Sequence, residues 1–128
     1  MNPSFTAYPL PGKMTFSAAV RVGPMLVVSG MTAADDNRQI VGTDLETQTR
    51  FIYEKLGKVL ETAGASFADV IETIDYVTTF EGYGKTADVR REVFGDGPFP
   101  AATGVKVAGL IRKGALIEIR TVAWLGES

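Results

Sequence analysis

The chain contains no cysteine and no histidine among its 128 residues. Without cysteine there is no disulfide, no thiolate nucleophile and no cysteine-ligated zinc. Without histidine there is no Ser-His-Asp triad and no imidazole base. The longest apolar runs, residues 25–28 and 122–125, have four residues each, whereas a membrane helix needs about 18. Any chemistry must therefore come from carboxylates, Arg and Lys side chains, hydroxyls, backbone amides and water.

A large excess of charge of either sign is also absent. The chain carries 13 Lys and Arg against 15 Asp and Glu, a net charge of −2, and its pI is about 5.1. Nucleic-acid-binding surfaces are typically basic, so we expect no nucleic-acid partner. The first five residues show neither the basic nor the apolar part of a signal peptide, and no membrane association is predicted. A cytoplasmic protein is the default expectation.

The length matches one domain, and we treat residues 1–128 as a single domain. Residues 1–13 carry three prolines and are expected to form an extended lead-in. Alternating or β-branched segments predict strands over residues 15–22, 25–30, 70–80, 103–110 and 115–125. Helical spacing predicts helices over residues 43–64 and 83–94. This β-β-α-β-α-β-β order predicts an α+β fold, with two helices packed on one face of a mixed sheet.

The first helix has clear start and stop signals. Thr43 and Glu46 have the spacing of a capping box, in which each side chain bonds the backbone of the other residue. Gly64 ends the helix. Between them an apolar stripe repeats at helical spacing. The stripe consists of Ile52, Leu56, Val59, Leu60 and Ala63.

The last predicted strand alternates between two faces. One face carries Ile117, Ile119, Thr121, Ala123 and Leu125, and the other carries Leu116, Glu118, Arg120, Val122 and Trp124. Because two helices can cover only one face of the sheet, the second face would leave an unusual apolar patch in water. We therefore expect that face to pack against copies of the same chain in a closed homo-oligomer.

Glu118, on that second face, is the first candidate for chemistry. A carboxylate near a subunit junction could act as a general acid or base that positions water. The alternative is a structural ion pair with Arg120 or Lys106. Gly30 ends a predicted strand, where its backbone amide could face a ligand or simply terminate the strand.

Three charged residues receive a structural interpretation. Arg90 and Arg91 are expected on the solvated face of the second helix. Asp75 stands among apolar residues of a strand, and polar Thr73 and Thr79 lie at periodic positions, so a partly hydrated strand face is expected. No metal-ligand spacing, no GxGxxG and no glycine-rich phosphate loop occurs, and we expect no metal and no cofactor.

Several stretches together resemble the RidA family, also called YjgF, of enamine and imine deaminases. The similarity covers roughly residues 14–125. The matching stretches are residues 16–20, 27–30, Gln48, 60–64, 69–71, 76–77, Phe99-Pro100-Ala101-Ala102-Thr103, and Leu116-Ile117-Glu118-Ile119 with Val122-Ala123. The resemblance implies a fold like that of trimeric bacterial chorismate mutase: three sheets form a central barrel, the helices lie outside, and the sites lie in clefts between subunits.

The resemblance also implies an activity and a set of site residues. Family members that act as deaminases hydrolyse reactive enamines and imines, such as 2-aminoacrylate, without a metal or cofactor. The Glu of their Ile-Glu-Ile strand orients water, and an Arg after Pro-Ala grips the substrate carboxylate. Carried over, Glu118 is the catalytic residue. The substrate-binding residues are Gly30, Phe16, Ala87, Ala102, Thr103 and Gly104.

This chain departs from the family pattern at the binding positions. Ala102 stands where the family has its Arg, Phe16 replaces a Tyr, Ala87 a frequent Asn, and Gly104 a frequent Cys. The segment between Ala102 and Glu118 is one residue longer than the usual spacing in the family. Losing a bidentate, charge-assisted contact costs about 2–4 kcal/mol of binding. We therefore expect a substrate larger or less acidic than 2-aminoacrylate.

Two functions remain open. The first is a trimeric enzyme that hydrolyses an enamine or imine, with Glu118 positioning water. The second is a trimer that binds a small molecule, or regulates, through the same inter-subunit cleft without catalysis. Action on RNA, suggested for some relatives, is disfavoured here because the chain is acidic and has no basic stripe.

Overall fold

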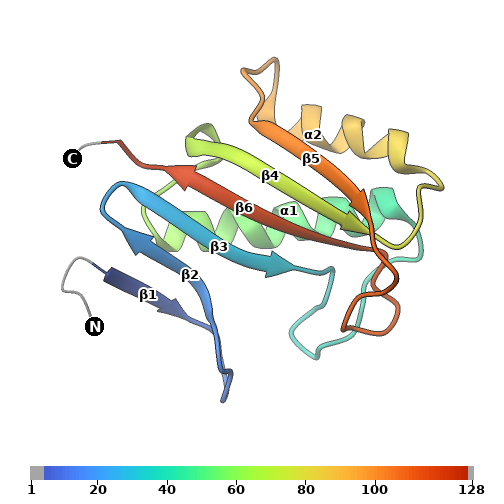
Figure 1. Ribbon diagram of the computed structural model, residues 1–128, viewed down its shortest axis with the longest axis horizontal. Helices are drawn as coiled ribbons and strands as arrows, with labels where there is room; N and C mark the ends of the chain where they lie inside the picture. Colours follow the sequence, from blue (N-terminus) through green and yellow to red (C-terminus); the bar gives the residue numbers. More distant parts are fainter. Residues whose placement is uncertain (1–4, 127–128) are drawn as a thin grey trace.

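A computed structural model describes residues 5–126 and shows a two-layer α+β arrangement (Figure 1). One six-stranded sheet has the order β1-β2-β3-β6-β4-β5. Its strands are β1 (Phe5–Pro9), β2 (Ser17–Val22), β3 (Met25–Met31), β4 (Val70–Val77), β5 (Ala101–Lys106) and β6 (Ile117–Trp124). The helices are α1 (Leu45–Thr62) and α2 (Thr86–Phe94), with short 3-10 turns at η1 (Phe67–Asp69) and η2 (Tyr83–Lys85).

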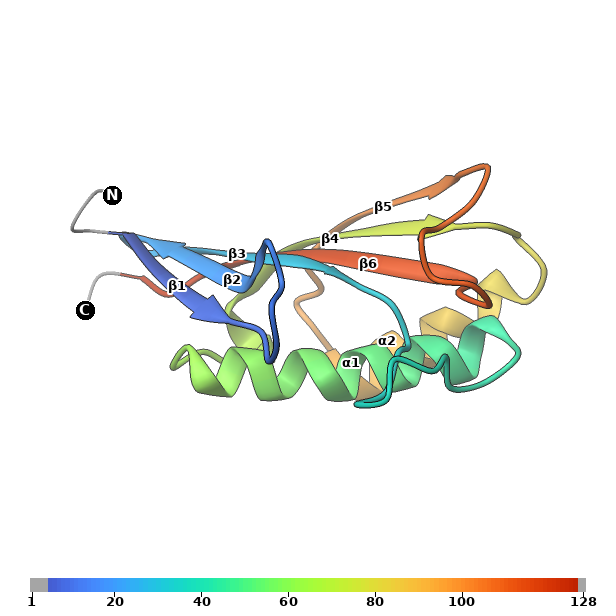
Figure 2. The same cartoon turned by 90° about the horizontal axis from the view of Figure 1, so that it is seen from below.

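The sheet is mixed and both helices lie on the same side of it. All neighbouring strands are antiparallel except β4 and β5, which are parallel. Figure 2 shows α1 and α2 side by side beneath the sheet and no helix above it. The predicted α+β fold, with two helices on one face of a mixed sheet, is confirmed. Among residues 5–126, no helix is both long and apolar enough to cross a bilayer.

The core lies between α1 and the helix-facing side of the sheet. The α1 stripe and the predicted inner face of β6 meet there, and their largest members are at most 2% exposed. These buried residues include Ile52, Leu56, Leu60, Ile117, Ile119 and Ala123. Burying a side chain of this size contributes about 1.5–3 kcal/mol. The alternation predicted for β6 is therefore correct, and it fixes Glu118 on the uncovered face.

The N-cap of the first helix lies one residue later than predicted. Asp44, in extended conformation, is the N-cap, and its carboxylate accepts a hydrogen bond of 2.7 Å from the Thr47 amide. The Thr43–Glu46 capping box is therefore wrong, because an Asp at the next position fills the same role and an N-cap carboxylate suits the positive end of the helix. Glu46 instead pairs with Arg50, at 3.3 Å.

Other boundaries also differ from the sequence prediction. Residues 5–9 of the predicted lead-in form β1, which pairs with β2; residues 1–4 lie outside the described part of the chain. The strand expected over residues 103–110 is β5, which lies earlier, at Ala101–Lys106, because its parallel pairing with β4 ends there. The second helix begins as a 3-10 turn before α2.

The β5 edge and the uncovered face expose apolar side chains. All six residues of β5 are exposed. On the uncovered face, Val22, Met25 and Trp124 stand in one cross-strand row, and each is at least 40% exposed. Exposed apolar surface of this kind is typical of interaction sites.

Candidate functional site

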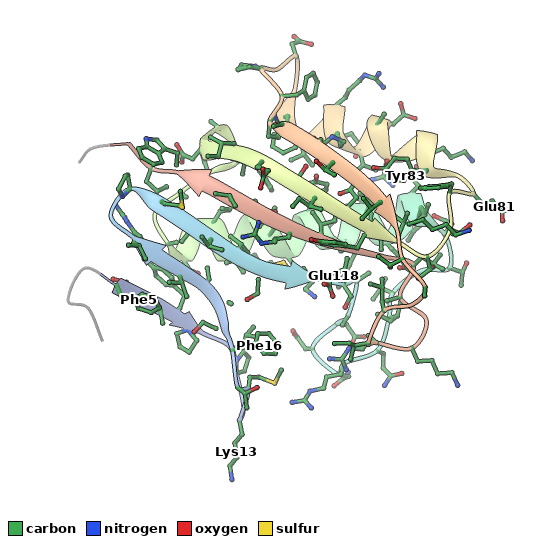
Figure 3. The ribbon with its side chains drawn as sticks, in the orientation of Figure 1. Phe5, Lys13, Phe16, Glu81, Tyr83 and Glu118 are labelled. Carbon is green, nitrogen blue, oxygen red and sulfur yellow. The ribbon has the colours of Figure 1, made fainter. Side chains whose placement is uncertain are left out.

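Glu118 lies on the uncovered face near the start of β6 (Figure 3). Its strand neighbours Ile117 and Ile119 are buried beneath α1, so alternation turns Glu118 to the opposite side. Tyr76 of β4 is its cross-strand partner. The carboxylate thus stands on a half-buried sheet surface that no helix covers.

Gly30 lies against the Glu118 carboxylate because of a β-bulge. Val28 pairs with Thr121 and Met31 with Ile119, so two residues of β3 stand opposite one residue of β6. A Cβ built on Gly30 would lie 2.6 Å from Glu118 Oε2. A side chain at position 30 would displace the Glu118 carboxylate from this place.

Glu118 makes no ion pair within the described part of the chain. Arg120, its neighbour on the same face, instead pairs with Glu72 of β4 at 3.7 Å. Lys106 stands beside Val77, whose buried side chain faces the helices, so Lys106 is on the other face of the sheet. The alternative interpretation of Glu118, a structural pair with Arg120 or Lys106, is therefore not observed in the single chain.

Phe16 directly precedes β2 and is 52% exposed. The Ser29 hydroxyl donates a 2.6 Å hydrogen bond to the Ser17 carbonyl, which holds the start of β2 to the end of β3. Phe16 and Gly30 are thereby brought to the same end of the β2–β3 hairpin. We call Glu118, Gly30 and Phe16 the Glu118 cluster.

A second group of predicted residues lies on the other side of the sheet. Ala102 and Gly104 of β5 stand beside Thr73 and Asp75 of β4, whose side chains are buried under the helices. Ala87 lies on α2, the helix nearest to β5 in Figure 1. We call Ala87, Ala102 and Gly104 the β5 cluster.

Thr103 lies on the opposite face of the sheet from its chain neighbours Ala102 and Gly104. It stands beside Ile74, on the face that carries Glu118. It is nevertheless two strands away from Glu118, because β4 lies between β5 and β6, and it is level with Arg120 and not with Glu118. The predicted site residues thus form two groups on opposite faces of one sheet. A single chain does not bring Glu118 and Ala102 into one pocket.

A polar network beneath β5 was not assigned a functional role from the sequence. The Tyr83 hydroxyl donates to Asp75 Oδ2 at 2.7 Å, and Arg90 Nη1 donates to the Tyr53 hydroxyl and to Thr73 Oγ1, at 3.0 Å each. The predictions of a hydrated strand face for Asp75 and of a solvated helix face for Arg90 are therefore wrong. Asp75 is only 4% exposed.

This error has a physical origin. A polar residue amid a strand is compatible with either a wet face or a buried hydrogen-bonded group, and the partners here are distant in sequence. Burial raises the pKa of the Asp75 carboxyl, an effect opposed by the Tyr83 hydrogen bond and the Arg90 charge. Burial, then the bond to Asp75, raises the pKa of Tyr83 as well, so its hydroxyl keeps its proton. Burial raises the pKa of Tyr53 to about 12.

An α+β chain with both helices on one face of a mixed sheet, and a carboxylate on the other, has the YjgF fold of the chorismate-mutase-like class. The model of a family described as Endoribonuclease L-PSP matches residues 9–125. The chain belongs to this family, the RidA/YjgF family.

Individual relatives agree with the family assignment. A RutC family protein from Pyrococcus abyssi is 34% identical over 110 residues, covering 85% of each chain. The structure of YyfA from Yersinia pestis, a Rid family protein, superposes with a TM-score of 0.86 at 27% identity over 94% of this chain and 98% of that one. A YjgF/YER057c/UK114 family member from Mycobacterium tuberculosis gives a TM-score of 0.81 at 33% identity, over 94% and 99%.

Proposed function

We propose that this protein hydrolyses an enamine or imine to a carbonyl compound and ammonia, with Glu118 as the general base. One observation carries the proposal: Glu118 is a carboxylate on an uncovered face, with Gly30 against it and its neighbour Arg120 already engaged by Glu72. A carboxylate free of a counter-ion can accept a proton from water.

The reaction balances with Glu118 and one water. An enamine becomes its imine tautomer when its carbon gains a proton and its nitrogen loses one, with water as the proton carrier. Glu118 accepts a proton from water as the water oxygen bonds to the imine carbon. It then returns that proton to the nitrogen, which gives a carbinolamine. Glu118 next moves the hydroxyl proton of the carbinolamine to the nitrogen, the carbon–nitrogen bond breaks as the carbon–oxygen double bond forms, and ammonia and the carbonyl compound leave. No residue other than a positioned carboxylate is needed for these proton transfers.

The complete site is proposed to form between copies of the chain in a homotrimer. The Glu118 cluster and the β5 cluster lie on opposite faces of one sheet, so they can share a cleft only if the β5 edge of one copy approaches the uncovered face of the next. The exposed β5 strand and the apolar row of Val22, Met25 and Trp124 supply surface for that contact.

The substrate is proposed to be larger or less acidic than 2-aminoacrylate. Ala102 supplies no charge for a carboxylate, and Ala87 and Gly104 keep the β5 cluster small. The proposed partners are a small molecule and two further copies of the chain, not nucleic acid or a membrane, and a cytoplasmic location remains a prediction.

The test is ammonia release from freshly generated 2-aminoacrylate and from longer enamines such as aminomuconate. We expect faster turnover of the longer enamines and a loss of about 100-fold or more in Glu118→Gln. Glu54→Gln is the matched control, because it makes the same change at an exposed carboxylate of α1, on the other side of the sheet from Glu118, and it should stay within a few-fold of wild type. Equal rates for wild type and Glu118→Gln would exclude Glu118 from the mechanism.

A second candidate is a binding or regulatory trimer without catalysis, and the alanine at position 102 favours it. Stabilisation by stable metabolites in a thermal-shift screen, with no ammonia release from any enamine, would support it.

The name of the matching family also mentions an endoribonuclease. Cleavage of RNA by wild type but not by Glu118→Gln would favour that activity over both others.

A further inference from the structure

Asp75 and Tyr83 form a buried acid–hydroxyl pair beneath the β5 edge. Tyr83 donates to Asp75 Oδ2 at 2.7 Å, while Asp75 Oδ1 is buried and has no hydrogen-bond partner within residues 5–126. A Cβ built on Gly104 would lie 2.6 Å from the Tyr83 hydroxyl oxygen. That oxygen therefore occupies the space that a side chain at position 104 would fill. Gly104 is exposed and Tyr83 is half-buried, so the oxygen lies beneath an exposed position of the strand.

The direction of this hydrogen bond determines what Tyr83 offers to a ligand. An ionised carboxylate can only accept, so the hydroxyl proton is committed to Asp75. The lone pairs of the Tyr83 oxygen remain available, and Tyr83 faces a ligand as an acceptor. Arg90 uses its Nη1 on Tyr53 and Thr73 and forms no ion pair with Asp75 within the described residues.

We propose that Tyr83, held by Asp75, makes the β5 side of the cleft select a ligand that presents a hydrogen-bond donor: an amide, amine or hydroxyl group. This inference rests on the proposed function, because it takes Ala102 and Gly104 as one wall of the reaction cleft. The arrangement inverts the recognition that an arginine at position 102 would give, since an arginine donates to a carboxylate and Tyr83 accepts from a donor.

A carboxylate ligand is disfavoured at this position for two reasons. It has no proton to give to the Tyr83 oxygen, and it approaches the buried negative charge of Asp75. A carboxamide has the same shape, carries no charge and presents N–H groups. The substrate class that fits is an enamine or imine that carries an amide or amine in place of the carboxylate.

The test compares two stable product analogues of equal shape by isothermal titration calorimetry. They are 2-oxo-3-phenylpropanoate and its carboxamide, 2-oxo-3-phenylpropanamide. Wild type should bind the carboxamide about tenfold more tightly, the effect of roughly one hydrogen bond. Tyr83→Phe, which keeps the ring, and Gly104→Ala, which displaces the hydroxyl, should reduce the preference to about twofold or less. Tyr8→Phe makes the same chemical change on β1, at the other edge of the sheet, and should keep the preference.

Three results would overturn the inference: tighter binding of the carboxylate by wild type, an unchanged preference in Tyr83→Phe, or binding of neither compound. Failure of the proposed function has a different signature. If the preference depends on Tyr83 while Glu118→Gln releases ammonia as fast as wild type, the selectivity stands and the catalytic role of Glu118 falls. If Glu118→Gln is inactive but no preference exists, only the inference about Tyr83 fails.

Discussion

Single residues in this molecule have properties that depend on which side of the sheet they occupy. Glu118 and Asp75 are both strand carboxylates, and Asp75 stands beside Ile119, the residue next to Glu118. Glu118 remains on the uncovered face, whereas Asp75 is enclosed by η2 and α2 and accepts a hydrogen bond from the Tyr83 hydroxyl. A carboxylate buried in this way destabilises its own ionised form.

Asp75→Asn tests the consequence for stability. Because the pKa of Asp75 is raised above its ordinary value of 3.8, the folded state holds the proton more tightly than the unfolded state does. This contribution to stability is present below that value and is lost as pH rises through the raised pKa. Asparagine does not titrate and still accepts the Tyr83 bond. Urea unfolding between pH 3 and 8 should show the stability of the variant rising relative to that of wild type as pH rises. Parallel stability curves would contradict the assignment.

At the scale of elements, α1 positions the strand that carries Glu118. Gln48 of α1 is fully buried. Its Nε2 donates to the carbonyls of Gly42 and Gly114, at 3.0 and 3.1 Å, and its Oε1 accepts from the Leu116 amide at 2.8 Å. One side chain thus joins the entry to α1 with the entry to β6, two residues before Glu118.

Gln48→Leu should therefore destabilise the fold and misplace β6. It leaves two carbonyls and one amide without their partner, for a loss of about 2–4 kcal/mol in the free energy of unfolding. Gln39→Leu is the control, because Gln39 lies exposed in the loop before α1, and it should change stability by less than about 0.5 kcal/mol. Denaturant unfolding measures both. A loss in Gln48→Leu no larger than in the control would show that the three bonds contribute little.

Periodicity in the sequence predicts these elements well because it reports burial directly. The stripe of α1 and the two faces of β6 follow from it, and so does the position of Glu118 on the uncovered face. Contacts between distant segments leave no such signal. The bulge that sets Gly30 against Glu118, and the pair of Tyr83 with Asp75, depend on strand register and on how α2 packs, which local residue patterns do not specify.

For the whole molecule, the separation of the two clusters is the central fact. The family resemblance supplies Glu118 and Ala102 as members of one site, and the fold of one chain puts them on opposite faces of the sheet. The proposed rotationally symmetric trimer would resolve this, since a heterologous interface can set the Glu118 cluster of each copy against the β5 cluster of the next. The site is then a property of the assembly.

Mixing two inactive variants tests this arrangement. Glu118→Ala removes the carboxylate from the Glu118 cluster, and Ala102→Trp fills the β5 cluster; each alone should be inactive on a substrate that wild type turns over. In trimers reassembled from an equal mixture, about one interface in four combines an intact Glu118 cluster with an intact β5 cluster from a neighbour. The mixture should recover about a quarter of the wild-type rate of ammonia release. Mixing Glu118→Ala with the double variant Glu118→Ala/Ala102→Trp is the control and should recover nothing. A site contained in one chain would give no recovery in either mixture, and a monomeric mass by light scattering at micromolar concentration would remove the basis for the proposal.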